Sequence, residues 1–355
     1  MTLILGLESS CDDTAVAVVR DGVEVLSNIV SSQDELHARF AGVVPEIASR
    51  AHLERIIPVV ELALEKAGTK PCELGAVAVA NRPGLVGGLI VAVSTAKALS
   101  AAWDKPLITV SHIAAHLYAG IMACPAWNSP AVALTASGGH TLLCLMEGPR
   151  EFKLLGRTID DAGGEAFDKG ANLLGMPGQG GAALDRLAKA GDPRKYRFPR
   201  PLKGDSGHDF SFAGLKTALL YEIFGPGGNT DMMPVAEMTQ QRLADLAASY
   251  QEAICDVLAT KALRAVEEYN ARTLFVTGGV AANSRLREIL FASAGKAGVE
   301  VVFPPLSLCT DNAAMIAGLA FEHYRVGEFS DLECDAAARS VEQGKPDPTL
   351  ARGQL

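Results

Sequence analysis

The sequence has few aromatic residues, no closely spaced cysteine pair and no long uninterrupted hydrophobic run. Aromatic residues make up 6% of the 355 residues, and the seven cysteines include no C-x-x-C pair. This argues against a disulfide framework and against a thiolate zinc site. The apolar stretch GGLIVAVSTAKALSAAW is interrupted by Lys97 and hydroxyl residues, and the N-terminus MTLILGLESSCDD lacks the basic region of a signal peptide. We therefore expect a cytoplasmic protein with no membrane segment.

The sequence also lacks an excess of basic residues. Its formal net charge of −9 at pH 7 argues against a broad basic surface for gripping nucleic acid. The exception is the segment 186–203, RLAKAGDPRKYRFPRPLK, which holds seven lysines and arginines, one aspartate and two aromatic residues. This composition suits phosphate contacts and base stacking. The alternative is a solvated loop without a ligand.

The sequence contains the same order of predicted strands and helices twice. Its content of 48% hydrophobic residues is sufficient to build the cores of two domains. Each half reads as a hairpin, then strand, loop and helix, then strand and helix. The paired segments are 3–19 and 130–146, 74–102 and 272–297, and 105–120 and 299–324. The pattern predicts an α/β fold of two duplicated domains that face a central cleft.

The Pro- and Asn-containing stretch 124–130 separates the two patterns and marks the expected domain boundary. We expect a first domain over 1–125 and a second over 126–333. Residues of about 150–230 have no counterpart in the first half and are predicted to be an insertion. The segment 334–355 is predicted to be a polar, poorly ordered tail.

Two histidines four residues apart, His112 and His116, follow Ser111, a residue type that caps helix N-termini. At helical spacing both imidazoles lie on one face and could share a metal ion. Asp311 occupies the matching place in the second half, so we predict that it completes the metal site. In the alternative interpretation, the histidines are buried polar residues and Asp311 only caps a helix. A zinc protease is disfavoured because Ile113 stands where such enzymes carry a glutamate.

Glycine-rich turns follow apolar strands at 135–141 and 277–288, where bare backbone N–H groups could approach a phosphate or a ribose. Neither turn matches the P-loop or the dinucleotide motif, and each by itself could be only a tight turn. The run 160–188 combines glycines with many acids, of which Asp168 and Asp185 could accept hydrogen bonds from hydroxyl or ammonium groups. The alternative is an acidic loop facing solvent.

Nine motifs, in order, resemble one protein family. They are LGLESSCDDTAVAV, GVVPEIASRAH, RPGLVGGLIVAVSTAKAL, SHIAAH, SGGHT, DDAGGEAFDKGANLLG, FSFAGLKTA, TGGVAANSRLR and CTDNAAMIA. Together they span about residues 3 to 320 and resemble the TsaD family (YgjD or Gcp) of the Kae1/Qri7 group. This family belongs to the actin-like, sugar-kinase and Hsp70 (ASKHA) ATPase superfamily, which agrees with the duplication.

The resemblance implies a tRNA N6-adenosine threonylcarbamoyltransferase, an acyltransferase that makes t6A. The enzyme would move the threonylcarbamoyl group from threonylcarbamoyl-AMP to the N6 amine of the adenosine 3′ to the anticodon, in tRNAs reading ANN codons. The reaction needs no protein nucleophile; a metal ion, glycine-turn amides and helix starts would stabilise developing charge.

The resemblance also assigns residues. It implies one divalent ion on His112, His116 and Asp311, with Fe2+ the first choice and Zn2+ the second. Opening acids that match the family's phosphate-side hairpin, and are the candidate catalytic residues, are Glu8, Asp12 and Asp13. Substrate contacts carry over to Thr135, Ala136, Ser137, Gly138, Gly139, Asp168, Gly181, Asp185 and Asn283.

The expected partners are tRNA, threonylcarbamoyl-AMP and the TsaB and TsaE proteins, with a TsaC-type enzyme supplying the adenylate. The acidic net charge also favours helper subunits for tRNA binding. Two alternatives belong to other classes. One is an ATP-dependent small-molecule kinase of the same superfamily, which would have no use for the histidine pair. The other is a nucleotide-gated interaction protein without catalytic activity.

Overall fold

The computed structural model describes residues 1–37, 43–176, 180–225 and 234–339. The chain divides into two compact units. Unit 1 comprises Met1–Ala126, Gly148–Phe152 and the chain from Ser307 onward, and unit 2 comprises Trp127–Glu147 and Lys153–Leu306. Each unit is built around its own mixed five-stranded sheet.

Unit 1 contains a sheet with the strand order β3-β2-β1-β4-β5. Its strands are β1 (Leu3–Glu8), β2 (Asp13–Arg20), β3 (Glu24–Ser32), β4 (Ala76–Arg82) and β5 (Leu107–Ser111). Its helices are α1 (Asp34–His37), α2 (Pro45–Ala67), η2 (Pro71–Glu73), α3 (Val86–Trp103), α4 (His112–Ala123) and α10 (Ala313–Arg325), with η5 (Leu306–Leu308) at the crossing from unit 2. Strands β1 to β3 are antiparallel neighbours, whereas β1, β4 and β5 run parallel.

Unit 2 repeats this arrangement, with the strand order β10-β9-β6-β7-β8. Its strands are β6 (Ala131–Ala136), β7 (Thr141–Met146), β8 (Phe152–Arg157), β9 (Thr273–Thr277) and β10 (Glu300–Val302). Its helices are α5 (Gly163–Leu173), α6 (Gly180–Ala188), α7 (Ala213–Phe224), η3 (Pro234–Glu237), α8 (Gln240–Glu268), η4 (Gly279–Ala282) and α9 (Ser284–Ala297). Because β6 to β10 repeat the order of β1 to β5, the predicted α/β duplication is confirmed.

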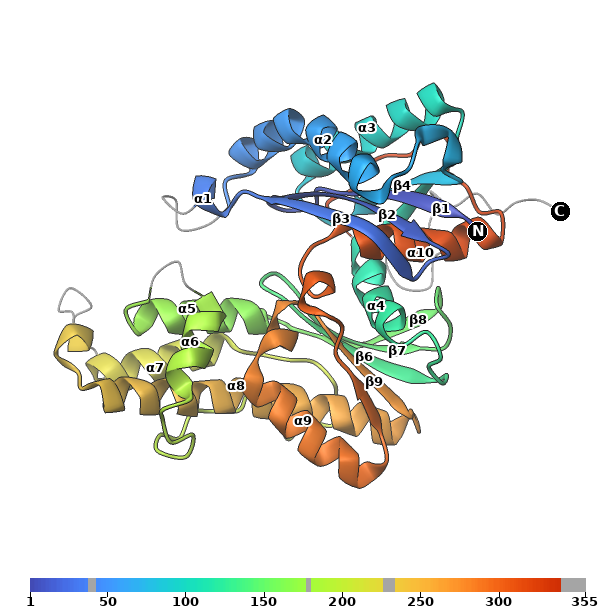
Figure 1. The fold of residues 1–355 in the computed structure, drawn as a ribbon. Coiled ribbons are helices and arrows are strands. Elements are labelled where there is room, and N and C mark those ends of the chain that lie inside the picture. Colours follow the sequence, from blue (N-terminus) through green and yellow to red (C-terminus); the bar gives the residue numbers. More distant parts are fainter. Residues whose placement is uncertain (38–42, 177–179, 226–233, 340–355) are drawn as a thin grey trace. The chain divides into compact units, whose positions relative to one another are not determined.

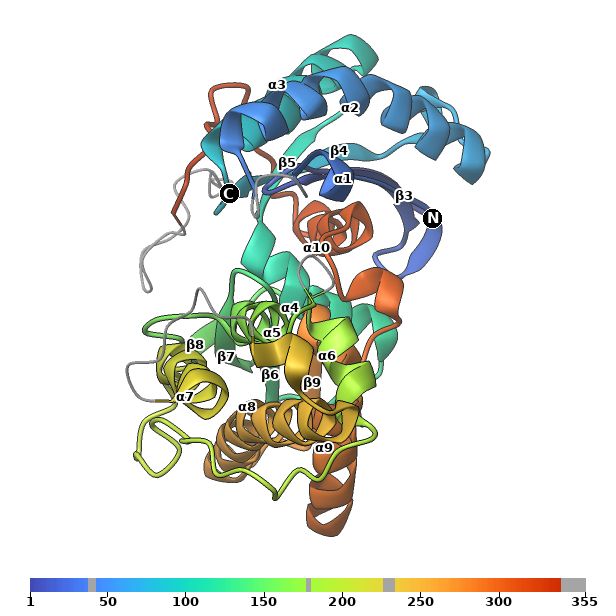
Figure 2. The ribbon, with the colours of Figure 1, turned by 90° about the vertical axis from the view of Figure 1, so that its left-hand side faces the viewer.

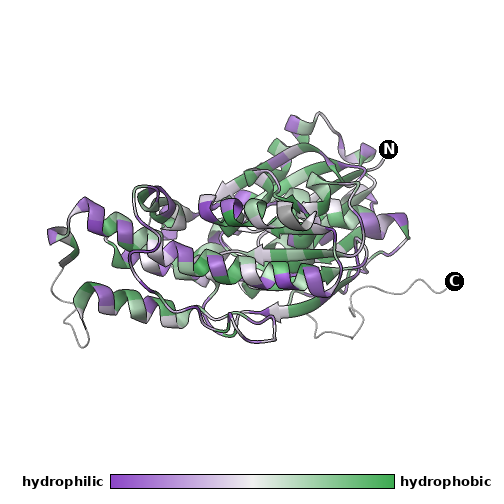
Figure 3. Cartoon of the chain, turned by 90° about the horizontal axis from the view of Figure 1, so that it is seen from below, coloured by the Kyte–Doolittle hydropathy of each residue, from purple (hydrophilic) through white to green (hydrophobic). Residues whose placement is uncertain are grey.

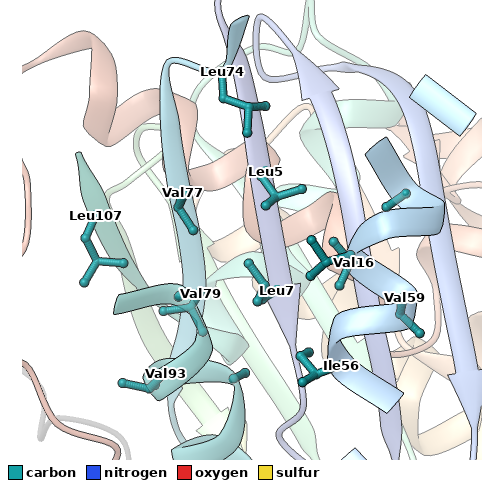
Figure 4. Packing of buried hydrophobic residues seen from close by; sticks show 14 of the residues in the cluster. Leu5, Leu7, Val16, Ile56, Val59, Leu74, Val77, Val79, Val93 and Leu107 are labelled. Carbon is teal, nitrogen blue, oxygen red and sulfur yellow. The ribbon is translucent and has the colours of Figure 1, made fainter. Parts of the chain in front are cut away.

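The sheet of unit 1 is covered on both faces. Helices α2 and α3 lie on one face and α10 lies on the other (Figures 1 and 2). This explains why β1 and β2 read as nearly continuous apolar runs, whereas the residues of the edge strand β3 are partly or fully exposed except for Ser27. In the core under α2 and α3, Leu7 and Val16 of the sheet pack with Ile56 and Val59 of α2 (Figure 4).

The close approach of α10 to β1 depends on Gly6. A Cβ at this position would lie 2.5 Å from the backbone oxygen of Ala313 and 2.8 Å from the nitrogen of Ala317. Only a residue without a side chain lets the first turns of α10 rest on the strand. Gly6 therefore helps to set the position of the residues that lead into α10.

The expected domains differ from the structure at two places. The predicted insertion of about 150–230 begins too early, because β8 is the counterpart of β3 in the repeated strand order. The second difference lies at the C-terminal end. The prediction grouped 307–333 with the second domain, but the chain from Ser307 onward belongs to unit 1 because α10 packs on the sheet of unit 1. The expected polar tail also begins differently: Cys334 is 5% exposed and joins the core of unit 1, and Ala337 donates its N–H to the backbone oxygen of Asn81. The rest of the expected tail, 340–355, lies outside the described residues.

Local sequence signals account for many helix ends. Helix α2 has Pro45 in its first turn and ends at Gly68 in the left-handed conformation, and α9 ends likewise at Gly298. Helix α3 is long and apolar enough to cross a membrane by length and composition, but its face around Leu89 and Ala92 is buried on β4 and α2. Hydrophobic and hydrophilic residues alternate along the helices in Figure 3, whereas the strands are mostly hydrophobic.

Candidate functional site

The two histidines of the motif SHIAAH lie in the first turns of α4. Strand β5 ends at Ser111, whose hydroxyl accepts a hydrogen bond from the Ala114 backbone N–H and caps the helix, as predicted. One turn apart on the same helix, His112 is 3% exposed and His116 is 2% exposed. Their Nε2 atoms are 3.2 Å apart.

Asp311 meets both rings. Its Oδ1 lies 3.0 Å from Nε2 of His116 and 3.6 Å from Nε2 of His112. Asp311 does not cap α10, because the cap is Asn312, whose Oδ1 accepts the Met315 N–H at 3.1 Å. The structure therefore supports the predicted cluster over the alternative in which Asp311 is only a helix cap. All three residues belong to unit 1.

The donor set has the dimensions of a tetrahedral metal site. Ligand atoms about 2.0–2.1 Å from a tetrahedral ion are about 3.3 Å apart. The three separations in the cluster are 3.0, 3.2 and 3.6 Å, which scatter around that value. Two imidazole nitrogens and a carboxylate oxygen at these separations can hydrogen bond through a ring N–H or can bind one cation between them. The cluster is compatible with a divalent metal ion.

Glu8, at the end of β1, orients the ring of His112 through the nitrogen that does not face the cluster. Its Oε2 lies 2.9 Å from Nδ1 of His112, and Ser10 Oγ lies 3.2 Å from the same nitrogen. A carboxylate can only accept, so Nδ1 carries a proton and Nε2 is the ring nitrogen that faces the cluster. Burial alone would lower the pKa of His112, but the carboxylates of Glu8 and Asp311 outweigh burial and raise that pKa to about 9.

The other predicted acids occupy different surroundings from Glu8. Glu8 is fully buried, and its second oxygen, Oε1, accepts the Ser10 N–H at 2.5 Å. Asp12 lies in the turn between β1 and β2, and Asp13 begins β2; both are partly exposed. Of the three candidate catalytic acids, Glu8 is therefore placed to orient a histidine.

In unit 2, the two predicted glycine turns lie at the same edge of the sheet. Strands β6 and β9 are parallel neighbours, and Thr135 pairs with Thr277 at their ends. The parallel strands therefore deliver the turn 137–140 and Gly278–Gly279 side by side. Gly138, Gly139 and Gly279 are exposed, and no atom of the described residues stands within 4 Å of where a Cβ would be.

Helix α5 begins against the first glycine turn. The Gly164 N–H donates to the Ser137 backbone oxygen at 3.1 Å, and a Cβ on Gly164 would lie 2.4 Å from that oxygen. Thr135 and Ala136 are fully buried in β6, and Thr135 Oγ1 contacts Thr277 Oγ1 at 2.9 Å. Of the five turn residues predicted to bind substrate, only Ser137, Gly138 and Gly139 present surface, because the other two are inside the sheet.

The polar residues of unit 2 that are predicted to contact the substrate are held by hydrogen bonds within the protein. The Gly181 N–H donates to Asp168 Oδ1 at 3.0 Å, which ties α6 to α5. Burial raises the pKa of Asp168, although the Gly181 N–H opposes this shift. Asp185 Oδ1 accepts the Ser284 hydroxyl at 2.7 Å, so α6 is also tied to the start of α9.

Asn283 is 8% exposed and is held by protein groups. Its Oδ1 accepts the backbone N–H groups of Arg285 and Leu286, each at 3.0 Å, and also the thiol of Cys255 at 3.3 Å. Its Nδ2 donates to Gln251 at 2.7 Å. Capping α9 is thus the role that the structure gives to this residue.

Sequence reasoning missed two residues that organise these groups. Gln251 and Cys255, one turn apart on α8, both hold Asn283, and both are buried. The available signal was a glutamine on the buried face of a long amphipathic helix. The acids of the glycine-rich run also include a structural one, because Asp160 accepts the backbone N–H groups of Phe212 and Ala213 at the start of α7.

Comparisons with known proteins agree with these features. The TsaD family model, described as tRNA N6-adenosine threonylcarbamoyltransferase, matches residues 24–318. The enzyme of that name from Anaeromyxobacter dehalogenans strain 2CP-1 is 50% identical over 342 residues, 96% of this chain and 100% of the relative. The enzyme of the same name from Moorella thermoacetica is 48% identical over 337 residues, 94% of this chain and 96% of the relative.

Among solved structures, component A of (R)-2-hydroxyglutaryl-CoA dehydratase from Acidaminococcus fermentans aligns with a TM-score of 0.53 at 14% identity. The alignment covers 92% of this chain and 99% of that protein. At this identity the likeness bears on the fold, and it supports the ASKHA-type architecture. The family rests on the sequence relatives: the chain belongs to the TsaD family of tRNA N6-adenosine threonylcarbamoyltransferases.

Proposed function

We propose that this chain transfers the threonylcarbamoyl group of threonylcarbamoyl-AMP to the N6 amine of the adenosine 3′ to the anticodon, in tRNAs reading ANN codons. Family membership supports the reaction, and the observation that carries the proposal in this chain is the convergence of His112, His116 and Asp311. A small-molecule kinase has no use for such a cluster. Near-complete alignment with named transferases likewise disfavours the kinase and the non-catalytic alternative.

The three residues would hold one divalent ion, with Fe2+ the first choice and Zn2+ the second. The separations of 3.0–3.6 Å between their donor atoms and the orientation of His112 by Glu8 support this assignment. When bound, such an ion supplies a Lewis acid that can polarise a carbonyl or phosphate oxygen. The chain's own contribution is to keep a proton on Nδ1 of His112 and to direct Nε2 at the ion, which would displace the proton of Nε2.

The donor's phosphate would lie against the exposed amides of unit 2. Gly138 and Gly139 carry no side chain over their backbone, and the start of α5 lies against the same turn. Asp168 and Gly181, which are hydrogen bonded to each other, are the proposed contacts to hydroxyl or ammonium groups. AMP leaves as a stable anion, so the protein needs no nucleophile, and its main tasks are positioning and charge stabilisation.

Asp12 and Asp13 remain the candidates for accepting the amine proton. Both residues are partly exposed, Asp12 in the turn between β1 and β2 and Asp13 at the first position of β2, where its Oδ1 is buried. The departing phosphate is the alternative acceptor. Glu8 is a weaker candidate because both of its oxygens already accept hydrogen bonds inside the protein.

For tRNA, the proposed contact is the basic strap, defined here as residues 186–203. Side chains of α8 hold the strap in place: Asp245 accepts the Asp192 N–H at 2.8 Å, and Ser249 accepts the Tyr196 N–H at 3.1 Å. Asp256 pairs with two of the seven cations, Arg200 and Lys203, each at 2.6 Å. The cations that remain exposed are Arg186, Lys189, Arg194, Lys195 and Arg197.

Five exposed cations on a fixed segment suit a phosphate backbone. Only one of the two aromatic residues of the strap is available for the predicted base stacking. Phe198 is 4% exposed and packs edge-on against Tyr250 with ring centroids 5.6 Å apart, so Tyr196 is the one aromatic residue of the strap left for stacking.

Helper proteins of the TsaB and TsaE type are proposed as partners. In unit 1, α2 exposes Leu53 (69%) and Ile57 (47%), and α3 exposes Val86 (41%) and Ile90 (51%). Large apolar side chains on neighbouring helices suit a protein partner. The net charge of −9 supports the need for help in binding tRNA.

Elemental analysis of anaerobically purified protein, combined with mass spectrometry of tRNA nucleosides after reconstitution with threonylcarbamoyl-AMP, tests the proposed function. We expect His116→Ala and Asp311→Asn to lose both metal and t6A formation. The matched control is His323→Ala, since His323 is another buried histidine of unit 1, bonded to Glu328. Full transfer by a metal-free His112→Ala/His116→Ala protein would refute the role of the cluster, and phosphorylation of a small molecule from labelled ATP would favour the kinase.

A further inference from the structure

A buried polar network lies under the hairpin tip, which we define as residues 9–12 between β1 and β2. Its centre is His52 of α2, a fully buried residue from the motif GVVPEIASRAH. Nε2 of His52 lies 3.1 Å from the Cys11 backbone oxygen, and Nδ1 lies 2.8 Å from Thr14 Oγ1. These contacts have no part in the proposed function, although the motif GVVPEIASRAH is as distinct in the sequence as the motifs that form the metal cluster and the glycine turns.

The hydrogen-bond partners define one state of His52. A carbonyl oxygen can only accept, so Nε2 carries the proton and Nδ1 is the acceptor. Nδ1 then accepts from the Thr14 hydroxyl and from Nε2 of Gln33 at 3.3 Å. Burial lowers the pKa of His52, although the Cys11 carbonyl opposes this shift, and the neutral ring is the form that satisfies every partner.

The network continues toward the start of α2. Oε1 of Gln33 lies 3.3 Å from Nε2 of His37, so this ring donates to the glutamine. Nδ1 of His37 in turn accepts the Val44 N–H at 3.3 Å. Two neutral imidazoles and one amide thereby connect the backbone at Val44 to the hairpin tip at Cys11.

The hairpin tip carries the groups that orient the metal cluster. Glu8 immediately precedes the tip and Ser10 lies within it, and both contact Nδ1 of His112, at 2.9 and 3.2 Å. The start of α3 holds the tip from another side: the Leu85 N–H donates to the Ser10 backbone oxygen, and Ser9 Oγ donates to the Gly88 oxygen.

His52 and α3 meet at Gly88. A Cβ on Gly88 would lie 2.4 Å from the Ser9 backbone oxygen and 3.2 Å from the His52 ring. The tip is therefore enclosed by the helix start and the imidazole. Of these two supports, the imidazole is the one whose hydrogen-bond donor can be altered without changing the backbone.

We propose that His52 is a positioning residue for the His112–His116–Asp311 cluster: by donating to the Cys11 carbonyl, it fixes the tip that presents Glu8 and Ser10 to His112. The inference rests on the proposed metal site. Gln33 and His37 hold His52 in the correct tautomer and orientation. Loss of the donor should loosen the tip and weaken the hold on the ring of His112, without removing any ligand.

The test is the affinity of the full-length protein for Zn2+, measured by competition with a chromophoric chelator, and the visible absorption spectrum of the Co2+ form. Loss of an outer-shell partner weakens metal binding by about 10- to 100-fold, and His52→Ala should lose about tenfold. His52→Gln, whose amide can reach the position of Nε2 and donate to Cys11, should recover most of the affinity. His52→Asn, whose shorter amide matches Nδ1 instead, should not.

His323→Ala is the control for removing a buried histidine from unit 1, and it should bind Zn2+ like the unaltered protein. If circular dichroism shows that His52→Ala is unfolded, the comparison of His52→Gln with His52→Asn decides the question. Equal Zn2+ affinity and an unchanged Co2+ spectrum in a folded His52→Ala or His52→Asn protein would overturn the inference. Failure of the unaltered protein to bind either metal would instead refute the proposed function.

Discussion

Replacement of Glu8 by glutamine separates orientation of the metal cluster from proton transfer. The carboxylate has one oxygen on each of two N–H donors, the Ser10 backbone at 2.5 Å and His112 Nδ1 at 2.9 Å. A glutamine side chain has a single acceptor oxygen, so its NH2 group must face one of those donors. Glu8→Gln therefore either loses the hydrogen bond to His112 or leaves the Ser10 N–H unpaired.

The expected loss of metal affinity or of folding stability depends on which donor the NH2 group of the glutamine faces. If the amide turns its NH2 toward His112, an outer-shell partner is lost, which costs about 10- to 100-fold in metal affinity, equivalent to about 1.4–2.7 kcal/mol. If it turns its NH2 toward Ser10, a buried N–H is left without an acceptor, which costs about 1–3 kcal/mol of folding stability. Glu8 is fully buried, so water cannot supply the missing acceptor.

Zn2+ competition titrations, urea unfolding and t6A kinetics at subsaturating and saturating metal distinguish the outcomes. If Glu8 acts by orienting His112, saturating metal should restore most of the transfer rate of Glu8→Gln. If Glu8 accepted the amine proton, the rate would stay low at any metal concentration. Asp12→Asn, which changes a neighbouring and partly exposed acid, is the control and should keep its metal affinity.

A Glu8→Gln protein with unchanged Zn2+ affinity and unchanged unfolding free energy would contradict the orienting role of Glu8. Such a result would mean that the tip adapts to the amide, and that the hydrogen bond at 2.9 Å does not hold the ring. A loss of transfer with intact metal affinity would instead return Glu8 to the candidate catalytic acids.

Three further predictions concern the strap and the core. Charge reversal at Arg194, Lys195 and Arg197 should weaken tRNA binding. The slope of the logarithm of the binding constant against the logarithm of the salt concentration should fall in magnitude by about two to three, at about 0.7–0.9 per phosphate contact. The control is Lys153→Glu/Arg272→Glu, on exposed residues of unit 2 outside the strap, and an equal slope in both proteins would place the tRNA elsewhere. Asp256→Asn should cost up to about 1 kcal/mol of stability at neutral pH. Burial opposes but does not cancel the effect of Lys203 and Arg200, which hold the pKa of Asp256 below its ordinary value. The contribution of Asp256 to stability is therefore complete above about pH 4 and is lost as the pH falls through the lowered pKa. The urea midpoints of the unaltered protein and of Asp256→Asn across pH 3–7 should converge at the acid end, and parallel curves would contradict this. Gly6→Ala should destabilise unit 1 by about 1–3 kcal/mol through overpacking, because its Cβ would lie 2.5 Å from the Ala313 oxygen, whereas Gly204→Ala, at an open position, should have little effect in the same unfolding assay.

The fold could be predicted where the determinants are local. Apolar runs such as 3–8 and 131–136, each followed by a turn of small residues and a second apolar run, predict hairpins, and both hairpins form as antiparallel pairs. The matching order of elements in the two halves also predicts the second sheet from the first. Alternation, turn chemistry and helix caps act over a few residues, so they are legible without the tertiary structure.

The site could be predicted only in part. The histidine pair and the matching place of Asp311 suffice to predict the cluster, but not the orienting role of Glu8, which depends on contacts between residues about a hundred positions apart. The family resemblance implied that Thr135 contacts substrate, and the composition of segment 186–203 suggested that Phe198 stacks on bases, yet Thr135 is buried in a sheet and Phe198 against Tyr250. Burial of a single side chain is decided by tertiary packing, which composition does not record.

The assignment of α10 to unit 1 shows how a duplicated pattern can mislead about domains and still predict a site. The repeat places α10 after β10, so sequence order groups it with unit 2. The missing side chain of Gly6 allows α10 to pack on β1 instead, and the chain enters unit 1 at Ser307. Asp311 lies just before α10, so the packing of this helix brings its carboxylate to the histidines of α4, 3.0 Å from the nearer ring. The geometry of the three donor atoms is therefore a property of the core of unit 1, and Gly6→Ala, which disturbs only that core, should weaken Zn2+ binding as well as stability.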